Sequence, residues 1–158
     1  MSSPIIPPAD GSQERRNMNA QERTARNKEI VRRFVEEVVN RGRADLINDL
    51  VAADYVFHCP DGDLYGPLGA RLNVEELWLA FPDLHMDLTD LVGEGNLVAR
   101  RFVLRGVHLG PFLGLRPTED DVSIPGIALD RLANGRIAES WIAFNTLGLV
   151  HAGMSVPT

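Results

Sequence analysis

The stretch that decides the fold runs from residue 97 to residue 114 and reads LVARRFVLRGVHLGPFLG. Its first eleven residues alternate in the way typical of a β-strand, in which successive side chains point to opposite faces of a sheet. This alternation splits the basic neighbours Arg100, Arg101 and Arg105 between two faces. The glycines at positions 106, 110 and 114 then interrupt the pattern, and we expect this segment to connect two strands.

The same period of two continues on both sides of this stretch. Further strands are predicted at about residues 55–58, 84–92, 121–132 and 136–146, with turns at 60–63, 93–96 and 134–135. Upstream the spacing of apolar residues is helical instead, and it predicts helices at about residues 24–42, 44–51 and 68–81. Helices followed by an antiparallel sheet are the α+β arrangement. We expect the curved sheet to wrap around the N-terminal helices and to leave an apolar pocket.

Composition limits the classes of function that are open. The 158 residues suit one domain, which we expect at residues 21–158 after a disordered N-terminal extension at residues 1–20. No apolar run approaches the roughly 20 residues that span a bilayer. The net charge of −6 disfavours nucleic acid as a partner. A lone cysteine, Cys59, and the absence of a secretory pattern in the first residues lead us to expect a cytoplasmic protein.

The sequence does not favour a metal site, a nucleotide-binding site or a nucleophilic cysteine. The four histidines show no HxxxH or HxH spacing, so we expect no metal site. No glycine-rich loop joins a strand to a helix, which leaves nucleotide phosphates without a cradle. Cys59 is expected to be a half-buried structural residue rather than a nucleophile.

The remaining candidates are polar residues next to apolar segments. His58 ends a predicted strand, where it would face either the cavity or solvent. Asn73 lies inside an apolar helix, where a polar side chain is unfavourable unless it has a partner, and a ligand is the favoured partner. Asp130 is either a pocket carboxylate with a raised pKa or an exposed residue at a strand end. His108 serves either a structural hydrogen bond or catalysis. Trp78 is more often core than substrate contact.

A resemblance to a known family rests on four segments. These are AFPDL at 80–84, GVHLGPFLG at 106–114, GI at 126–127 and NGRIAESW at 134–141. Together they resemble the SnoaL-like polyketide cyclases, which have the cone-shaped NTF2-like fold, and the resemblance covers about residues 27–153. It is specific for the fold and broad for function, because NTF2-like pockets host cyclases, isomerases, dehydratases, hydrolases and hydroxylases.

The resemblance also implies positions for the site. The family's cyclases use an aspartate near the end of the last strand and a histidine on the strand before it as general acid and base in an intramolecular aldol reaction. Carried over to this chain, the two positions hold Ile142 and Ala128, and neither side chain can move a proton. The pocket asparagine of the third helix carries over to Asn73 and the polar residue that ends the first strand falls near His58. An aromatic pocket residue late in the first helix is replaced by Val39.

A chain that keeps the family's frame without this pair resembles the branch that hydroxylates anthracycline-type polycyclic quinones. That branch implies no bound flavin, haem or metal, and the electrons for molecular oxygen come from the reduced substrate itself, which a partner reductase supplies at the expense of NADPH. Asn73, His58 and Arg101 are then expected to hold substrate oxygens while the pocket orients the substrate and excludes water. The rest of the expected pocket is lined by Val39, Trp78, His108, Ala128, Ile142 and Phe144.

Two other classes of function stay open at this point. One is a cyclase, isomerase or hydrolase in which Asp130 or His58 has taken over the missing acid/base role. The other is a polyketide-binding module without catalysis.

The cyclase positions also make a structural prediction. Placing residues 128 and 142 on one face requires, we expect, a three-residue hairpin loop with a left-handed Gly135 instead of a two-residue Asn-Gly turn. Residues 128, 130, 140, 142 and 144 would then point inward, and Ile127, Leu129, Ile137 and Trp141 outward. Such an apolar outer face predicts a homodimer, or cover by the segment 147–154.

Overall fold

The N-terminal helix begins where the sequence offers a capping residue. The computed structural model describes residues 19–154, so the extension expected at residues 1–20 lies almost wholly outside the described residues. The side-chain oxygen of Asn19 accepts a hydrogen bond from the backbone N–H of Glu22 at 2.8 Å and caps α2 (Ala20–Arg33). The helix continues without a break into a π-helical turn, η1 (Phe34–Val39), which buries Phe34 and its apolar neighbours against the sheet.

The middle of the chain differs from the sequence prediction in one element. A short 3₁₀ turn, η2 (Ala44–Leu46), leads into α3 (Ile47–Leu50), and β1 (Val51–Cys59) follows at once. Part of the turn expected at residues 60–63 is instead the start of an edge strand, β2 (Gly62–Tyr65), which pairs antiparallel with β1. Its four residues are too short and too polar to show a period of two. The next helix, α4 (Gly66–Ala80), has Pro67 in its first turn, where the missing backbone N–H of proline costs no helical hydrogen bond.

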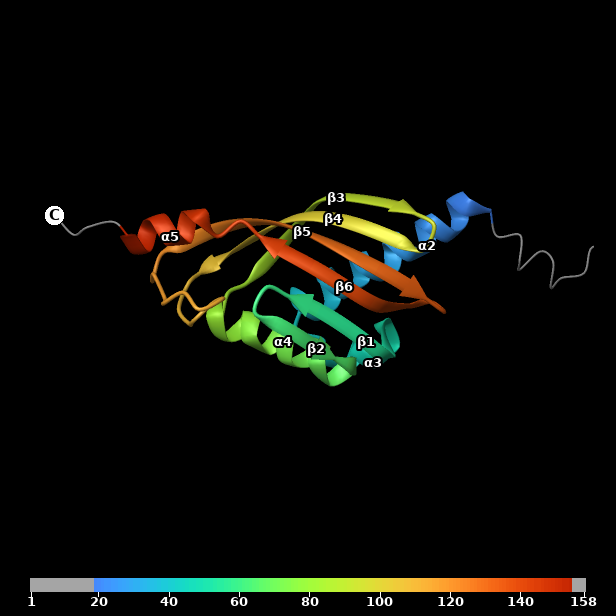
Figure 1. Cartoon of the computed structure of the whole chain (residues 1–158), viewed down its shortest axis with the longest axis horizontal. Coiled ribbons are helices and arrows are strands. Elements are labelled where there is room, and N and C mark those ends of the chain that lie inside the picture. The colour runs from blue at the N-terminus through green and yellow to red at the C-terminus, as the bar shows by residue number, and fades with distance from the viewer. Residues whose placement is uncertain (1–18, 155–158) are drawn as a thin grey trace, which may run out of the picture.

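The last four strands are confirmed nearly as predicted. They are β3 (His85–Glu94), β4 (Leu97–Val107), β5 (Asp121–Ala133) and β6 (Arg136–Phe144), and α5 (Leu147–Met154) follows them. The described strands form one curved sheet in the order β2-β1-β6-β5-β4-β3. The sheet is not antiparallel throughout, because β1 runs parallel to β6. In Figure 1 helices α2 and α4 lie along one side of the sheet, which we call the inner side, and the opposite side of strands β3–β6 is uncovered.

The β5–β6 hairpin has the predicted pairing, but a register shift within the strands produces it instead of the predicted loop. Ala128 pairs with Ile142, as expected. The loop is nevertheless a two-residue turn, since Ala133 pairs with Arg136 and both turn residues have positive φ, 52° at position 134 and 76° at position 135. A register shift next to Arg131 adds the extra residue instead, so the expected three-residue loop is wrong.

The shift also reverses the orientation of one side chain. Ile137 was expected outside and is only 2% exposed, because it precedes the irregularity and therefore keeps the opposite alternation. Ile127, Leu129 and Trp141 point outward as predicted, with exposed fractions of 59%, 36% and 38%.

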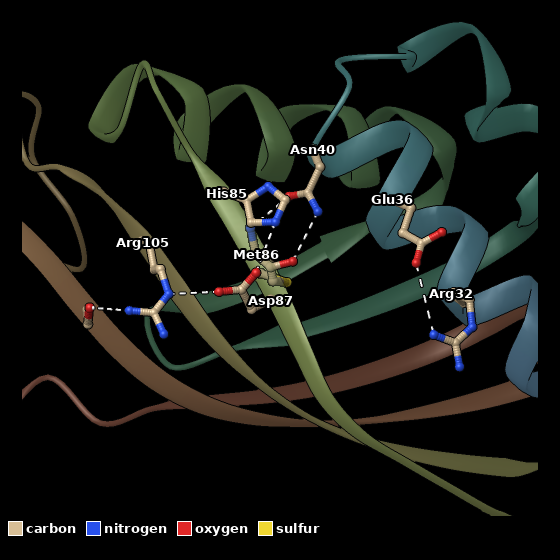
Figure 2. Close-up of polar contacts among 8 residues, drawn as sticks. Arg32, Glu36, Asn40, His85, Met86, Asp87 and Arg105 are labelled. Carbon is tan, nitrogen blue, oxygen red and sulfur yellow. Dashed lines mark hydrogen bonds and ion pairs between the residues drawn. The ribbon is translucent and has the colours of Figure 1, made fainter.

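The core lies between the helices and the inner face of the sheet. Phe102 is fully buried, and its ring lies over Gly126, where an added Cβ would come within 2.4 Å of the ring. Asn40 joins the end of the first helical segment to β3, since its side chain accepts from the backbone N–H of Met86 at 2.7 Å and donates to its carbonyl at 3.0 Å (Figure 2). Within residues 19–154, the helices are all too short or too polar to cross a bilayer.

A candidate pocket between α4 and the loop at residues 111–114

The best-formed cavity lies between α4, the end of β1 and the loop that follows β4. Its volume is about 260 Å³. The lining residues come from segments far apart in the sequence: Cys59, Asp61, Asn73, Glu76, Leu77, Leu79, Pro111, Phe112, Leu113, Gly114 and Phe144. Most of this surface is apolar, and the polar groups are few, which is the usual composition of a small-molecule site.

Helix α4 supplies one wall of the pocket. Glu76 and Leu77 follow Asn73 by three and four residues, so all three lie on the same side of the helix. Leu77 is buried, whereas Leu79 at the mouth is 75% exposed. The polar groups of this wall are therefore positioned by a helix whose neighbouring residues Val74, Leu77 and Ala80 pack in the core.

The opposite wall is a loop that is tied to the end of the same helix. The backbone N–H groups of Leu109 and Gly110 both donate to the carbonyl of Ala80, at 2.9 and 3.1 Å. Any side chain at position 110 would collide with α4, since an added Cβ would lie 2.5 Å from a backbone oxygen of the helix. A glycine is needed here for this close approach.

The tip of that loop presents an aromatic ring to the cavity. Phe112 and Leu115 exchange two backbone hydrogen bonds, at 3.1 and 2.9 Å, around Leu113 and Gly114, which have positive φ of 49° and 77°. The turn fixes the direction of Phe112, whose ring packs edge-to-face on Phe144 at 5.1 Å. The two rings give the pocket an aromatic floor.

The charged groups of the lining are acidic. Asp61 and Glu76 bring carboxylates, and no lysine, arginine or histidine is among the lining residues. Burial raises the pKa of the Cys59 thiol to about 12, helped by a hydrogen bond with Asp61. Cys59 is therefore a neutral thiol at physiological pH, and its expected structural role fits this environment better than nucleophilic catalysis. The pocket can accept protons and hydrogen bonds more readily than it can stabilise an anion.

Of the residues predicted to form the site, the structure brings two to this pocket. Asn73 and Phe144 line it. Ala128 and Ile142 are paired across the hairpin on the inner face, where Ala128 is 1% exposed and Ile142 packs on the core, but neither reaches the lining. The two positions to which the sequence resemblance assigns the cyclases' acid/base pair therefore hold apolar side chains.

Asp130 does not line this pocket, and its expected exposure at a strand end is wrong. It is fully buried and accepts a hydrogen bond from Arg100 Nε at 2.9 Å and another from Ser140 Oγ at 2.6 Å. Tyr55 is buried beside them, and burial raises the pKa of its hydroxyl far above the usual range. Asp130 belongs to a polar network in the core, which the sequence analysis missed because it did not anticipate the burial of Arg100.

His58 and Arg101 lie on the outer face of the sheet and do not line this pocket, so their contact with a substrate stays a prediction. His58 stacks on Trp141 with ring centroids 5.2 Å apart, and its ring nitrogens lie 3.0 Å from Asp63 and 2.7 Å from Glu139. The hydrogen bond with Glu139 raises the pKa of His58. Arg101 is exposed and pairs with Asp90. Strand alternation sends both side chains away from the pocket.

The hydrogen bonds of three further predicted pocket residues, His108, Val39 and Trp78, hold parts of the fold together. Nδ1 of His108 accepts a hydrogen bond from the backbone N–H of Thr118 at 3.2 Å, and burial lowers the pKa of the imidazole. Its Nε2 has no hydrogen-bond partner among the described residues. The indole N–H of Trp78 donates to the Val39 carbonyl at 3.0 Å and joins α4 to η1. None of the three lines the pocket.

A second depression runs beside the edge strand β3. Its charged side chains are already paired (Figure 2). Asp87 lies 2.9 Å from His85 and also contacts Arg105, outside the lining, at 2.7 Å, and Arg32 lies 3.9 Å from Glu36. Because these charges are already paired on an open surface, the depression is a weaker candidate than the pocket at α4. No cluster of three or more histidine, cysteine, aspartate or glutamate side chains within residues 19–154 is arranged to hold a metal ion.

The sequence analysis missed Asp61, Glu76 and the loop at residues 111–114. Glu76 could have been found, because it follows Asn73 by three residues in a predicted helix. Asp61 and the loop could not, because their contact with α4 depends on how the chain folds back.

The family follows from comparison with known proteins. A model of the SnoaL-like polyketide cyclases matches residues 29–152, most of the chain. The chain belongs to the SnoaL-like polyketide cyclase family. Its mixed fold, with an open, curved sheet of six strands, is the NTF2-like architecture of that family. The comparison with curated proteins found no match.

Solved structures of SnoaL-like proteins superpose well on this chain. A proposed SnoaL-like polyketide cyclase from Jannaschia sp. CCS1 is 26% identical with a TM-score of 0.74, over 84% of this chain and 94% of its own. IdmH, a proposed polyketide cyclase from Streptomyces antibioticus, is 27% identical with a TM-score of 0.69, over 80% and 96%. AclR, a proposed hydroxylase from Streptomyces galilaeus, is 28% identical with a TM-score of 0.69, over 85% and 87%. Family and neighbours together indicate a polyketide-related enzyme.

Proposed function

We propose that this SnoaL-like protein is a cofactor-independent hydroxylase of a polycyclic quinone, used in its reduced hydroquinone form, in aromatic polyketide biosynthesis of the anthracycline type. The observation that carries the proposal is the pair Ala128 and Ile142, which face one another on the inner side of the sheet. These positions correspond to the acid/base pair of the family's cyclases. Since a general acid or base contributes about 10²- to 10⁴-fold to a rate, a cyclase that depends on this pair would not function with alanine and isoleucine there. The likeness to AclR supports the same choice.

The shape of the pocket suits a flat aromatic substrate. Phe112 and Phe144 offer ring faces and edges, and Leu79 at the mouth leaves an apolar side chain 75% exposed. The cavity of about 260 Å³ lies just below the range of roughly 300–1,000 Å³ for drug-sized ligands. A substrate with three or four rings would therefore extend over Leu79 and cover it, which removes this apolar surface from water.

The reaction can be balanced without a bound redox group. The hydroquinone loses two electrons to become the quinone, the attacked carbon loses two more as its C–H becomes C–OH, and O₂ takes all four. One oxygen atom enters the product and the other leaves as water. A partner reductase that consumes NADPH would regenerate the hydroquinone. The SnoaL-like protein then has to orient the substrate, exclude water and accept a phenolic proton.

The acidic lining gives a role to residues that the sequence analysis had not selected. Ionisation of a hydroquinone makes it a better electron donor, and Glu76 is a carboxylate placed on the same helix face as Asn73. We assign Glu76 the role of proton acceptor and Asn73 the role of hydrogen-bond partner for a substrate oxygen. The neutral Cys59 thiol can donate to a second oxygen. His58, Asp130 and Arg101 have no part in this scheme.

The test is oxygen uptake together with product mass. Purified protein receives a chemically reduced anthraquinone in metal-chelated, flavin-free buffer, and the expected result is protein-dependent uptake with a product heavier by one oxygen atom. Glu76→Gln should lower kcat by at least about tenfold, and Asn73→Ala should mainly raise KM. Glu75→Gln is the matched control, because Glu75 precedes Glu76, pairs with Arg71 on the surface and does not line the pocket.

Failure of the proposal has a clear signature. A ring-closed or rearranged product formed under nitrogen would make the protein a cyclase or isomerase. That second candidate is favoured by the carboxylates in the lining, which could supply a relocated acid/base in place of the pair at positions 128 and 142. Saturable binding of the anthraquinone with no product in air or nitrogen would instead show a binding module.

A further inference from the structure

A small depression near the beginning of α2 is lined by basic and amide side chains. It lies where the helix passes the turns that join β3 to β4 and β5 to β6, at the same end of the molecule in Figure 1, and its volume is about 210 Å³. None of its described lining residues is acidic, although the chain carries a net charge of −6. We call this depression the arginine pocket; its lining residues are Arg23, Arg26, Asn27, Asn96, Leu132, Ala133, Asn134 and Gly135.

Hydrogen bonds between its three segments fix the shape of the arginine pocket. Asn27 is 7% exposed, and its side-chain Nδ2 donates to the carbonyl of Gly95 in the β3–β4 turn at 3.3 Å. The backbone N–H of Leu132 donates to the carbonyl of Asn96 at 2.8 Å and ties the two turns together. A ligand would therefore meet a depression that is already formed, which reduces the entropy lost on binding.

The helix directs two guanidinium groups at this depression. Arg23 and Arg26 are three residues apart, so they lie on the same side of α2, and both line the pocket. A Cβ at Gly135 would lie 3.6 Å from Nη2 of Arg26, so this guanidinium reaches the β5–β6 turn. The positive charge is thus held against the turn as well as on the helix.

The two guanidinium groups have no counter-charge in the described part of the chain. Neither Arg23 nor Arg26 forms an ion pair with a described carboxylate. Arg32 of the same helix, by contrast, lies 3.9 Å from Glu36. Glu22 precedes Arg26 by four residues and is well spaced for a pair, but its carboxylate accepts a hydrogen bond from the capping residue of α2 at 3.4 Å instead. Like charges three or four residues apart on a helix repel, and an anion between them would remove that repulsion.

The donors of the arginine pocket match a phosphate group. Guanidinium groups bind phosphate with paired N–H donors, and the amides of Asn96 and Asn134 can donate further hydrogen bonds. A phosphate monoester offers roughly two negative charges and three acceptor oxygens, whereas a carboxylate offers one charge and two oxygens. We propose that the arginine pocket binds a phosphate group, as free inorganic phosphate or as the phosphate monoester of a small molecule. The proposal is independent of the reaction in the pocket at α4.

The test is a titration of the full-length, nitrogen-15-labelled chain with inorganic phosphate, followed by NMR. Sodium chloride keeps the ionic strength constant, because salt screens exposed charges. The backbone amide signals of Gly95 and Gly135 report on the two turns and should shift saturably, with a dissociation constant on the order of 1 mM. Arg23→Gln and Arg26→Gln should each raise this constant at least about fivefold.

Arg33→Gln is the matched control. Arg33 is an exposed residue of the same helix, forms no ion pair with a described carboxylate and does not line the pocket, so this variant loses the same charge elsewhere. Its dissociation constant should stay within about twofold of the wild-type value. A well-dispersed spectrum shows that each variant is folded.

Glycerol phosphate distinguishes the two sources of the phosphate group. Tighter binding of glycerol phosphate than of inorganic phosphate would identify a monoester as the ligand, and the reverse order would identify free phosphate. Three results would overturn the proposal: no saturable shift of either glycine signal up to about 50 mM phosphate, an equal loss of binding in Arg33→Gln, or binding of acetate as tight as that of phosphate. The second result would show that only the general charge of the helix matters.

Discussion

The buried ion pair between Arg100 and Asp130 yields the sharpest prediction. The side chains are 6% and 1% exposed, with 2.9 Å between Nε and Oδ2. Asp130→Asn keeps the shape and the acceptor for Ser140 but leaves the guanidinium buried without a counter-charge. The other neighbours of Arg100 are weak partners: the Met86 sulfur at 3.8 Å and the Phe102 ring at 5.8 Å. We therefore expect Asp130→Asn to lower the free energy of unfolding by about 3–5 kcal/mol.

The neighbouring pair provides a control in the same strands. Arg101 and Asp90 form an ion pair whose side chains are 64% and 48% exposed, so Asp90→Asn should change the free energy of unfolding by less than about 1 kcal/mol. The double variant Arg100→Met/Asp130→Leu removes both buried charges and should recover most of the stability lost in Asp130→Asn. Urea unfolding followed by circular dichroism gives all of these values.

Two outcomes would contradict this reasoning. If Asp130→Asn lowers the free energy of unfolding by less than about 1 kcal/mol, then Arg100 reaches water or another acid, and the ion pair is not buried. If the folded variant keeps its stability but loses turnover, Asp130 is a catalytic acid or base after all. We expect the reverse, a loss of stability with kcat unchanged per folded molecule.

Three further predictions concern packing, pH and thiol chemistry. Gly126→Ala should lower the free energy of unfolding by about 1–3 kcal/mol, because its Cβ would lie 2.4 Å from the Phe102 ring. In urea unfolding, the double variant Gly126→Ala/Phe102→Leu should lose less stability than the sum of the two single variants. The pKa of His58 is raised chiefly by Glu139, so protonated His58 contributes its full stabilisation below about pH 6.5 and loses it as pH rises through the folded pKa. The urea midpoint should therefore fall over this pH range, and Glu139→Gln should make the fall smaller. Cys59, with a pKa of about 12, should react with iodoacetamide at pH 8 roughly 1,000-fold more slowly than a free thiol, and labelling followed by mass spectrometry checks this.

The pocket was only partly predictable. Asn73 was found because a polar residue inside an apolar helix is conspicuous in a sequence. Asp61 could not be recognised in the same way, since an aspartate between turn residues is common, and only the packing of α4 against β1 places it beside Asn73. The face on which His58 lies could not be predicted, because residues at a strand end alternate between faces, and the phase of that alternation depends on register.

The sequence by itself determined the order of helices and strands, the α+β class and the family, because periodicity, turn residues and motifs are local signals that survive without knowledge of contacts. Only the tertiary structure decided which polar groups meet. The register shift beside Arg131 turned Ile137 inward, burial joined Arg100 to Asp130, and the fold brought the loop at residues 111–114 against α4. These outcomes depend on contacts between residues up to about 40 positions apart, whose energies compete across the whole core, and no local pattern records the result.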